Sequence, residues 1–159
     1  MKVNGYEVGP NTDLTEADLR GANLDELDLS EADLSRALLQ KASLVRTNLS
    51  KAKLGRGDLT GPISLNGADL TEANLAGANL SKTDLSGADL FAADLSGVEL
   101  SDTRLDRTIL SQAKLSDADL RSVDLLGVSL VGADCERVNL RGAWMPGVNL
   151  SMANLARSD

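Results

Sequence analysis

A leucine stands at every fifth position between residues 66 and 95, and this spacing limits the possible backbone more than any other feature. The leucines of this stretch are Leu70, Leu75, Leu80, Leu85, Leu90 and Leu95. A small residue lies two positions before each leucine, and Asp or Asn lies one position before it. The repeating unit is therefore Ala-Asp/Asn-Leu-x-x.

A period of five residues fits neither an α-helix nor a flat β-strand. Each step of five advances about 140° around a helix beyond a full turn, and it alternates between the two faces of a strand. The pattern requires a backbone that itself turns once per repeat, so that the leucine and the small residue both point inward. We therefore expect a β-solenoid with stacked coils.

The small inward position indicates how many repeats make one coil. Every fourth repeat has alanine there, whereas the other repeats also accept larger residues such as Leu27, Ile63 and Val98. Four repeats per coil would stack these alanines in a single column. The alanines are Ala32, Ala52, Ala73, Ala93, Ala113, Ala133 and Ala153.

These repeats resemble the pentapeptide-repeat family, and the resemblance extends from about Asn11 to Leu155. It implies an all-β fold, a right-handed quadrilateral β-helix with four five-residue sides per coil. The 29 central positions would then make about seven coils. The family's fold is shared by members with different roles, so the resemblance says less about function.

The repeat also predicts how the chain is divided. Residues 1–12 precede the regular pattern, and their alternation of Val3, Tyr6 and Val8 with polar residues predicts an extended cap over the first coil. Residues 13–159 form a single repeat domain. One extra residue falls between Leu59 and Leu65, where Gly61 and Pro62 are typical of an altered turn.

Charge and composition exclude several classes of function. The chain has 16 Lys and Arg against 24 Asp and Glu, a net charge of −8, so we expect no direct binding to nucleic acid or to membranes. No segment approaches the roughly 18 apolar residues of a membrane span, and we expect a cytoplasmic protein. Histidine is absent and Cys135 is the only cysteine. We therefore expect no enzyme activity, no cofactor and no metal site.

Two functions remain for the acidic residues that precede the central positions. Asp and Asn alternate there, and both stabilise turns by accepting hydrogen bonds from nearby amides, which favours a rigid protein-binding scaffold. The resemblance implies an alternative, because some members are acidic rods that mimic DNA and bind a type II topoisomerase, DNA gyrase. For that alternative the candidate partner-binding residues are Asp58, Asp69, Asp89, Asp94, Glu99 and Asp119.

The size of the net charge disfavours mimicry of DNA. About 34 Å of duplex DNA carries about 20 phosphate charges, more than the net charge of this chain. We therefore prefer the scaffold, with a protein partner whose identity the sequence does not give.

Several apolar residues fall at outward positions in the second half of the chain. The four-repeat phase places them on two adjoining sides, so we expect a protein contact there and a homodimer through the C-terminal end. The candidates for self-association are Phe91, Ile109, Leu126, Val131, Trp144 and Met152.

Overall fold

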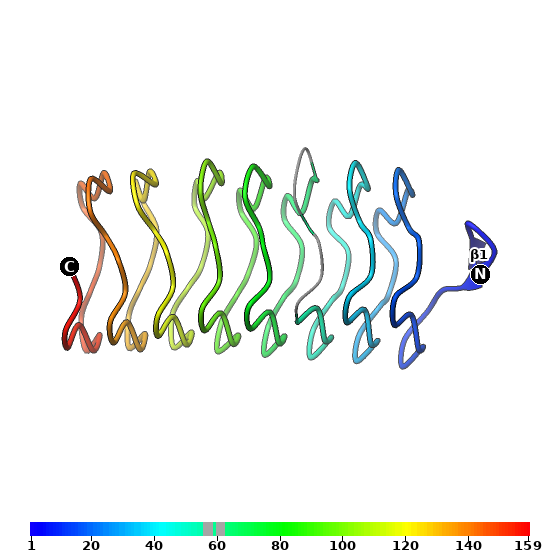
Figure 1. Cartoon of the computed structure of the whole chain (residues 1–159), viewed down its shortest axis with the longest axis horizontal. Helices are drawn as coiled ribbons and strands as arrows, with labels where there is room; N and C mark the ends of the chain where they lie inside the picture. The colour runs from blue at the N-terminus through cyan, green and yellow to red at the C-terminus, as the bar shows by residue number, and fades with distance from the viewer. Residues whose placement is uncertain (56–58, 60–62) are drawn as a thin grey trace.

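The chain forms a row of coils stacked along one long axis, with the N-terminal hairpin at one end (Figure 1). The computed structural model describes residues 1–55, 59 and 63–159. The hairpin consists of β1 (Lys2–Val3) and β2 (Tyr6–Glu7), which pair antiparallel with Lys2 opposite Glu7. Elsewhere in the described part, the coils are joined by isolated parallel bridges, and no helix is present.

The bridges show the length of one coil. Asp69 pairs with Asp89 and Glu99 pairs with Asp119, each 20 residues apart. Four repeats per coil are thereby confirmed. Across the extra residue the spacing is 21, as between Ser43 and Ser64, and the columns continue without a change of phase. The predicted altered turn at Thr60, Gly61 and Pro62 lies outside the described residues.

The four repeats of a coil define four sides, which we number in chain order by the residue before each central position. Side I contains Asp13, Asp33, Lys53, Asn74, Asp94, Lys114, Asp134 and Asn154. Side II contains Asp18, Leu38, Asn79, Glu99, Asp119 and Asn139. Side III contains Asn23, Ser43, Ser64, Asp84, Arg104, Asp124 and Trp144. Side IV contains Asp28, Asn48, Asp69, Asp89, Ile109, Ser129 and Asn149.

The core is the interior of the coils, and it consists of the central residues and the small residues two positions before them. Leu90 and Ala88 of one repeat are both fully buried, which confirms that both positions point inward. Threonine is accepted at the small position because its hydroxyl finds a main-chain acceptor. The Thr103 hydroxyl donates to the Leu80 carbonyl at 2.8 Å, and the Thr108 hydroxyl donates to the Leu85 carbonyl at 2.9 Å.

The hairpin hydrogen-bonds to the first coil through side chains. The Asn4 amide donates to the carbonyls of Asp18 and Arg20, both at 3.4 Å, and the Asp18 N–H donates to the Tyr6 hydroxyl oxygen at 3.1 Å. In the other coils these backbone groups bond to the preceding coil, as the Asp89 N–H does to the Ala68 carbonyl. Asn4 and Tyr6 therefore take the place of a missing neighbouring coil on side II.

The alanine column predicts where the core is least able to expand. Ala93 is fully buried between Ala73 and Ala113 of the adjacent coils. Ala93→Leu should overpack this side and lower the free energy of unfolding by about 1–3 kcal/mol in urea denaturation. Val128→Leu is the control, and it should cost less because that column already holds larger residues. Equal losses in the two variants would contradict this account.

Candidate partner-binding surface

The residue before each central position stabilises the turn that follows it. Its Oδ1 accepts a hydrogen bond from the N–H two residues later, as Asp89 does from Phe91 at 3.0 Å. Asn79 does the same from Ser81 at 2.9 Å. Asp and Asn are therefore equivalent for this bond, and the turn does not need the charge. This geometry supports the structural explanation of the acidic positions.

The second residue after each central position completes the corner in the left-handed conformation. Gly97 has φ 65° and Asp102 has φ 58°, and most repeats show the same sign. Glycine adopts this conformation without steric cost, which accounts for its recurrence at corners. The charged residues found at other corners project from the edges of the rod.

The structure does not gather the acidic residues of the DNA-mimic hypothesis on one side. Asp69 and Asp89 are neighbours on side IV, whereas Glu99 and Asp119 are neighbours on side II. These two sides are separated by two repeats and are opposite in a four-sided coil. Asp94 lies on side I, and Asp58 lies outside the described residues.

Neighbouring cations compensate two of these carboxylates. The Lys114 ammonium lies 3.9 Å from the Asp94 carboxylate. The Arg121 guanidinium donates to both oxygens of Asp119, and these bonds lower the pKa of that carboxyl. Within the described residues, Asp69 and Asp89 form no ion pair.

A band of positive charge surrounds the rod near its N-terminal end. The segment 36–56 contains six Lys and Arg and no acidic residue, so the rest of the chain has 10 cations against 24 acids, a net of −14. Four of these cations occupy the successive corners of one coil. They are Arg36, Lys41, Arg46 and Lys51, all with positive φ. We call these four together with Lys53 the basic belt.

The basic belt is largely paired within the chain. Arg36 contacts Glu16 at 3.2 Å, Lys51 contacts Glu72 at 3.9 Å, and Lys53 contacts Asp33 at 3.3 Å. Arg46 pairs with Glu26. The basic belt was not among the predicted functional residues, although the acid-free segment 36–56 is a visible signal for it in the sequence.

The exposed apolar residues lie on the two adjoining sides predicted for them. On side IV, Ile109 is bridged to Asp89 and Ser129, and Phe91 follows in the same side. Phe91 is 39% exposed and Ile109 is 41% exposed, whereas Val131 is half-buried. Their placement is confirmed, but their self-association stays a prediction.

The remaining apolar candidates include the most exposed ones. On side III, Trp144 is bridged to Asp124, and Leu126 follows in that side. Trp144 is 64% exposed. Met152, at the corner that follows side IV, is 90% exposed.

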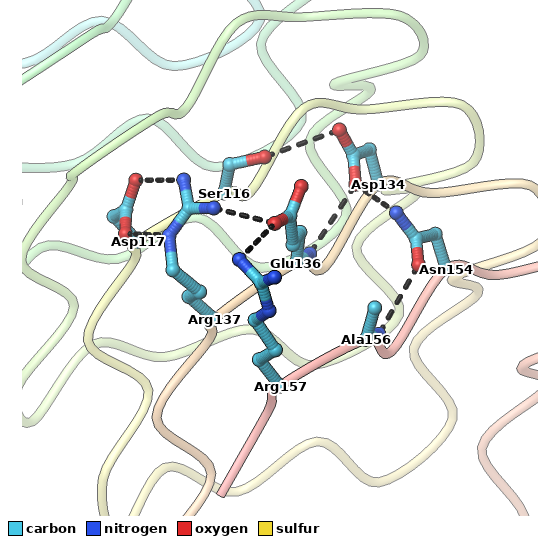
Figure 2. A network of polar contacts seen from close by, with 8 residues as sticks. All are labelled: Ser116, Asp117, Asp134, Glu136, Arg137, Asn154, Ala156 and Arg157. Atoms are coloured by element: carbon cyan, nitrogen blue, oxygen red, sulfur yellow. Dashed lines mark hydrogen bonds and ion pairs between the residues drawn. The ribbon is translucent and has the colours of Figure 1, made fainter.

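A polar network crosses the coils near the C-terminal end (Figure 2). Arg137 donates to both oxygens of Asp117, at 2.7 and 2.8 Å, and also to Glu136. Arg157 approaches Glu136 at 3.7 Å. These contacts raise the pKa of Arg137 and lower that of Asp117. Because its charges compensate one another, the network connects successive coils rather than forming a site for a ligand.

The groups that could support other chemistry are buried or dispersed. Burial raises the pKa of the Cys135 thiol to about 11, so the reactive thiolate is scarce at neutral pH. Among the described residues, no three His, Cys, Asp or Glu side chains are grouped to hold a metal. The described part also has no helix long and apolar enough to cross a membrane. The surface hollows include one of 620 Å³ between Tyr6 of the hairpin and Lys41.

Comparison with known proteins identifies the repeat. The family described as pentapeptide repeats matches residues 11–40, 28–61, 63–97, 99–134 and 133–159, with eight copies. The chain belongs to the pentapeptide-repeat family. No curated protein sequence matches it.

Solved structures of similar proteins come from several pentapeptide-repeat members. HetL of Nostoc sp. strain PCC 7120, involved in the regulation of heterocyst differentiation, is 36% identical; the match covers 94% of this chain and 74% of HetL, with a TM-score of 0.47. Rfr23 of Cyanothece 51142 is 25% identical over 87% of this chain and 84% of its own, with a TM-score of 0.39. QnrB1, a plasmid-mediated fluoroquinolone resistance protein, is 21% identical over 94% of this chain and 78% of its own, with a TM-score of 0.41.

At Asp89 the effect of the charge can be measured separately from the effect of the turn hydrogen bond. Asp89→Asn keeps the acceptor for the Phe91 N–H and should change the free energy of unfolding by less than about 0.5 kcal/mol. Asp89→Ala removes the acceptor and should cost about 0.5–1.5 kcal/mol. Urea denaturation measures both. A loss in the Asn variant as large as in the Ala variant would show that the charge itself stabilises the coil.

Proposed function

We propose that this chain is a non-enzymatic scaffold that binds another protein through the outward side chains of a rigid β-solenoid. The observation that supports it best is the separation of inward from outward positions. Leu90 and Ala88 build the core, while Ile109 and Trp144 face solvent and contribute little to it. The proposal includes a right-handed sense, about seven coils, an N-terminal cap of residues 1–12 and a cytoplasmic location.

A rigid rod suits such a role because it fixes the relative positions of surface groups. Residues 20 apart are held by hydrogen bonds on both edges of each repeat, as when the Leu90 N–H donates to the Ile109 carbonyl at 2.8 Å. A partner therefore binds a preorganised surface and orders few groups on this side of the interface.

Site-specific photocrosslinking tests the scaffold proposal. A benzophenone amino acid replaces one outward residue on each side in turn, and the variants are irradiated in the native cells. The four positions are Lys114, Glu99, Leu126 and Ile109, on sides I to IV. We expect a discrete protein adduct from at least one side and none in the dark controls. Four variants that fold but give no adduct would contradict the proposal.

A second copy of the chain is one partner that this experiment would reveal. Self-association through Phe91, Ile109, Leu126, Val131, Trp144 and Met152 is the alternative identity of the partner, supported by their exposure on adjoining sides. An adduct of twice 16.7 kDa from side III or side IV would support it. An adduct of any other mass would assign these residues to a different protein.

DNA mimicry is the alternative. The negative sign of the net charge supports it, although −8 is well below the about 20 phosphate charges of a duplex of the same length. The basic belt and the separation of Asp69 from Glu99 onto opposite sides reduce the likeness to a uniformly acidic duplex. We expect no inhibition of supercoiling by purified gyrase at micromolar concentrations of this protein. Inhibition that disappears in Asp69→Asn/Asp89→Asn, a variant that keeps its turn bonds, would establish mimicry instead.

A further inference from the structure

Side IV differs from the other three sides in its charge. From residue 68 to residue 152, within the described part of the chain, its outward positions and the corners that follow them include three carboxylates and no cation; Arg107 stands at a corner that precedes this side. The carboxylates are Asp69, Glu72 and Asp89. The other sides each contain cations in the same coils, for example Lys114 on side I, Arg121 on side II and Arg104 on side III.

The same side also carries a run of apolar groups. Phe91, Ile109 and Val131 occupy three consecutive coils, and Met152 lies at the corner of the next. Hydrogen bonds keep these coils in register: the Glu72 N–H donates to the Phe91 carbonyl at 2.9 Å, and the Gln112 N–H donates to the Val131 carbonyl at 2.8 Å. Side IV therefore has an acidic part followed by an apolar part along the rod.

The spacing of the coils fixes the dimensions of this surface. Adjacent strands lie about 4.8 Å apart, so Asp69 and Asp89 are separated by about 5 Å along the axis. Phe91 and Met152 are separated by three coils, or about 14 Å. Each of the two aspartates uses one oxygen for a turn bond, to Thr71 and to Phe91. Their second oxygens remain available to a partner.

We propose that side IV between residues 68 and 152 binds a basic amphipathic segment of a partner protein. This inference rests on the proposed scaffold function and names the surface and the chemistry of its partner. The segment has two Lys or Arg side chains that pair with Asp69 and Asp89. Its apolar residues cover Phe91, Ile109 and Val131. The whole surface from Asp69 to Val131 spans three coil steps, about 14 Å, which requires about ten residues of helix at 1.5 Å per residue.

Charge complementarity selects this occupant over two others. A nucleic acid or an anionic membrane would be repelled by Asp69 and Asp89, which form no ion pair among the described residues, whereas Glu72 is paired with Lys51. A second copy of this chain offers its basic belt, but Arg36, Arg46, Lys51 and Lys53 are already paired with acids of their own chain. Within the described residues that leaves Lys41 alone in the belt without an ion pair, whereas the surface needs two cations. A separate protein supplies cations without breaking those pairs.

Fluorescence anisotropy with a designed peptide tests the proposal. The probe is a labelled 14-residue peptide of Leu and Lys arranged at helical amphipathic spacing, and the control is a scrambled peptide of the same composition. Since the two peptides carry equal charge, their difference reports the matched apolar face. We expect the amphipathic peptide to bind at least about tenfold more tightly than the scrambled one. Equal affinities would overturn the proposal.

Matched variants then locate the binding surface. Asp69→Asn/Asp89→Asn keeps both turn bonds, and Phe91→Ser/Ile109→Ser introduces residues found in the next coil, at Ser111 and Ser129. Each pair should weaken binding about tenfold. The controls change the same charge and the same kind of apolar group on other sides: Asp102→Asn/Asp124→Asn and Leu126→Ser. They should change binding less than about twofold.

The outcomes separate this inference from the scaffold proposal. Equal weakening by the controls would show diffuse charge attraction and would overturn the assignment of side IV. A crosslinked partner on side I, II or III only would overturn it as well, yet it would leave the scaffold function standing. Thermal unfolding of each variant verifies that the fold is retained before binding is compared.

Discussion

Hydrogen bonds between main-chain groups about 20 residues apart hold every other feature of this molecule in place. Each repeat bonds in both directions, as when the Asp89 N–H donates to the Ala68 carbonyl and the Leu90 N–H donates to the Ile109 carbonyl. These bonds are satisfied only if each coil repeats the shape of its neighbour. The leucines and small residues must therefore recur in register, and outward residues are aligned in columns as a consequence.

This constraint explains which parts of the structure could be predicted from the sequence. The leucine period and the unbroken alanine column through Ala73 and Ala93 gave the four-repeat coil, because both reflect contacts made inside the coil. The same phase placed Ile109 and Trp144 on adjoining sides. Handedness could not be derived this way, since a coil of either hand has the same sequence period.

The arrangement and pairing of the charged side chains were predicted less well than the core, and the physical reason differs between residues. The six acidic candidates fall in three different columns rather than one, and the repeat period already contained that information. Which cation neutralises which carboxylate was harder to predict. Arg121 reaches a carboxylate two residues away, whereas Lys114 reaches one in the adjacent coil, and the choice depends on side-chain conformation rather than on spacing.

Stacking in register also has an electrostatic consequence. It places residues of one column about 4.8 Å apart, so acids in consecutive coils repel one another unless a cation intervenes. Sides I and III place Lys114 beside Asp94 and Arg104 beside Asp84, at 3.9 and 3.5 Å. Side IV leaves Asp69 and Asp89 adjacent and without an ion pair among the described residues. Stability alone would favour a cation or Asn at one of these positions, because Asn makes the same turn bond. The repulsion that remains on side IV would be relieved by a partner that supplies positive charge, which is the role proposed for this surface.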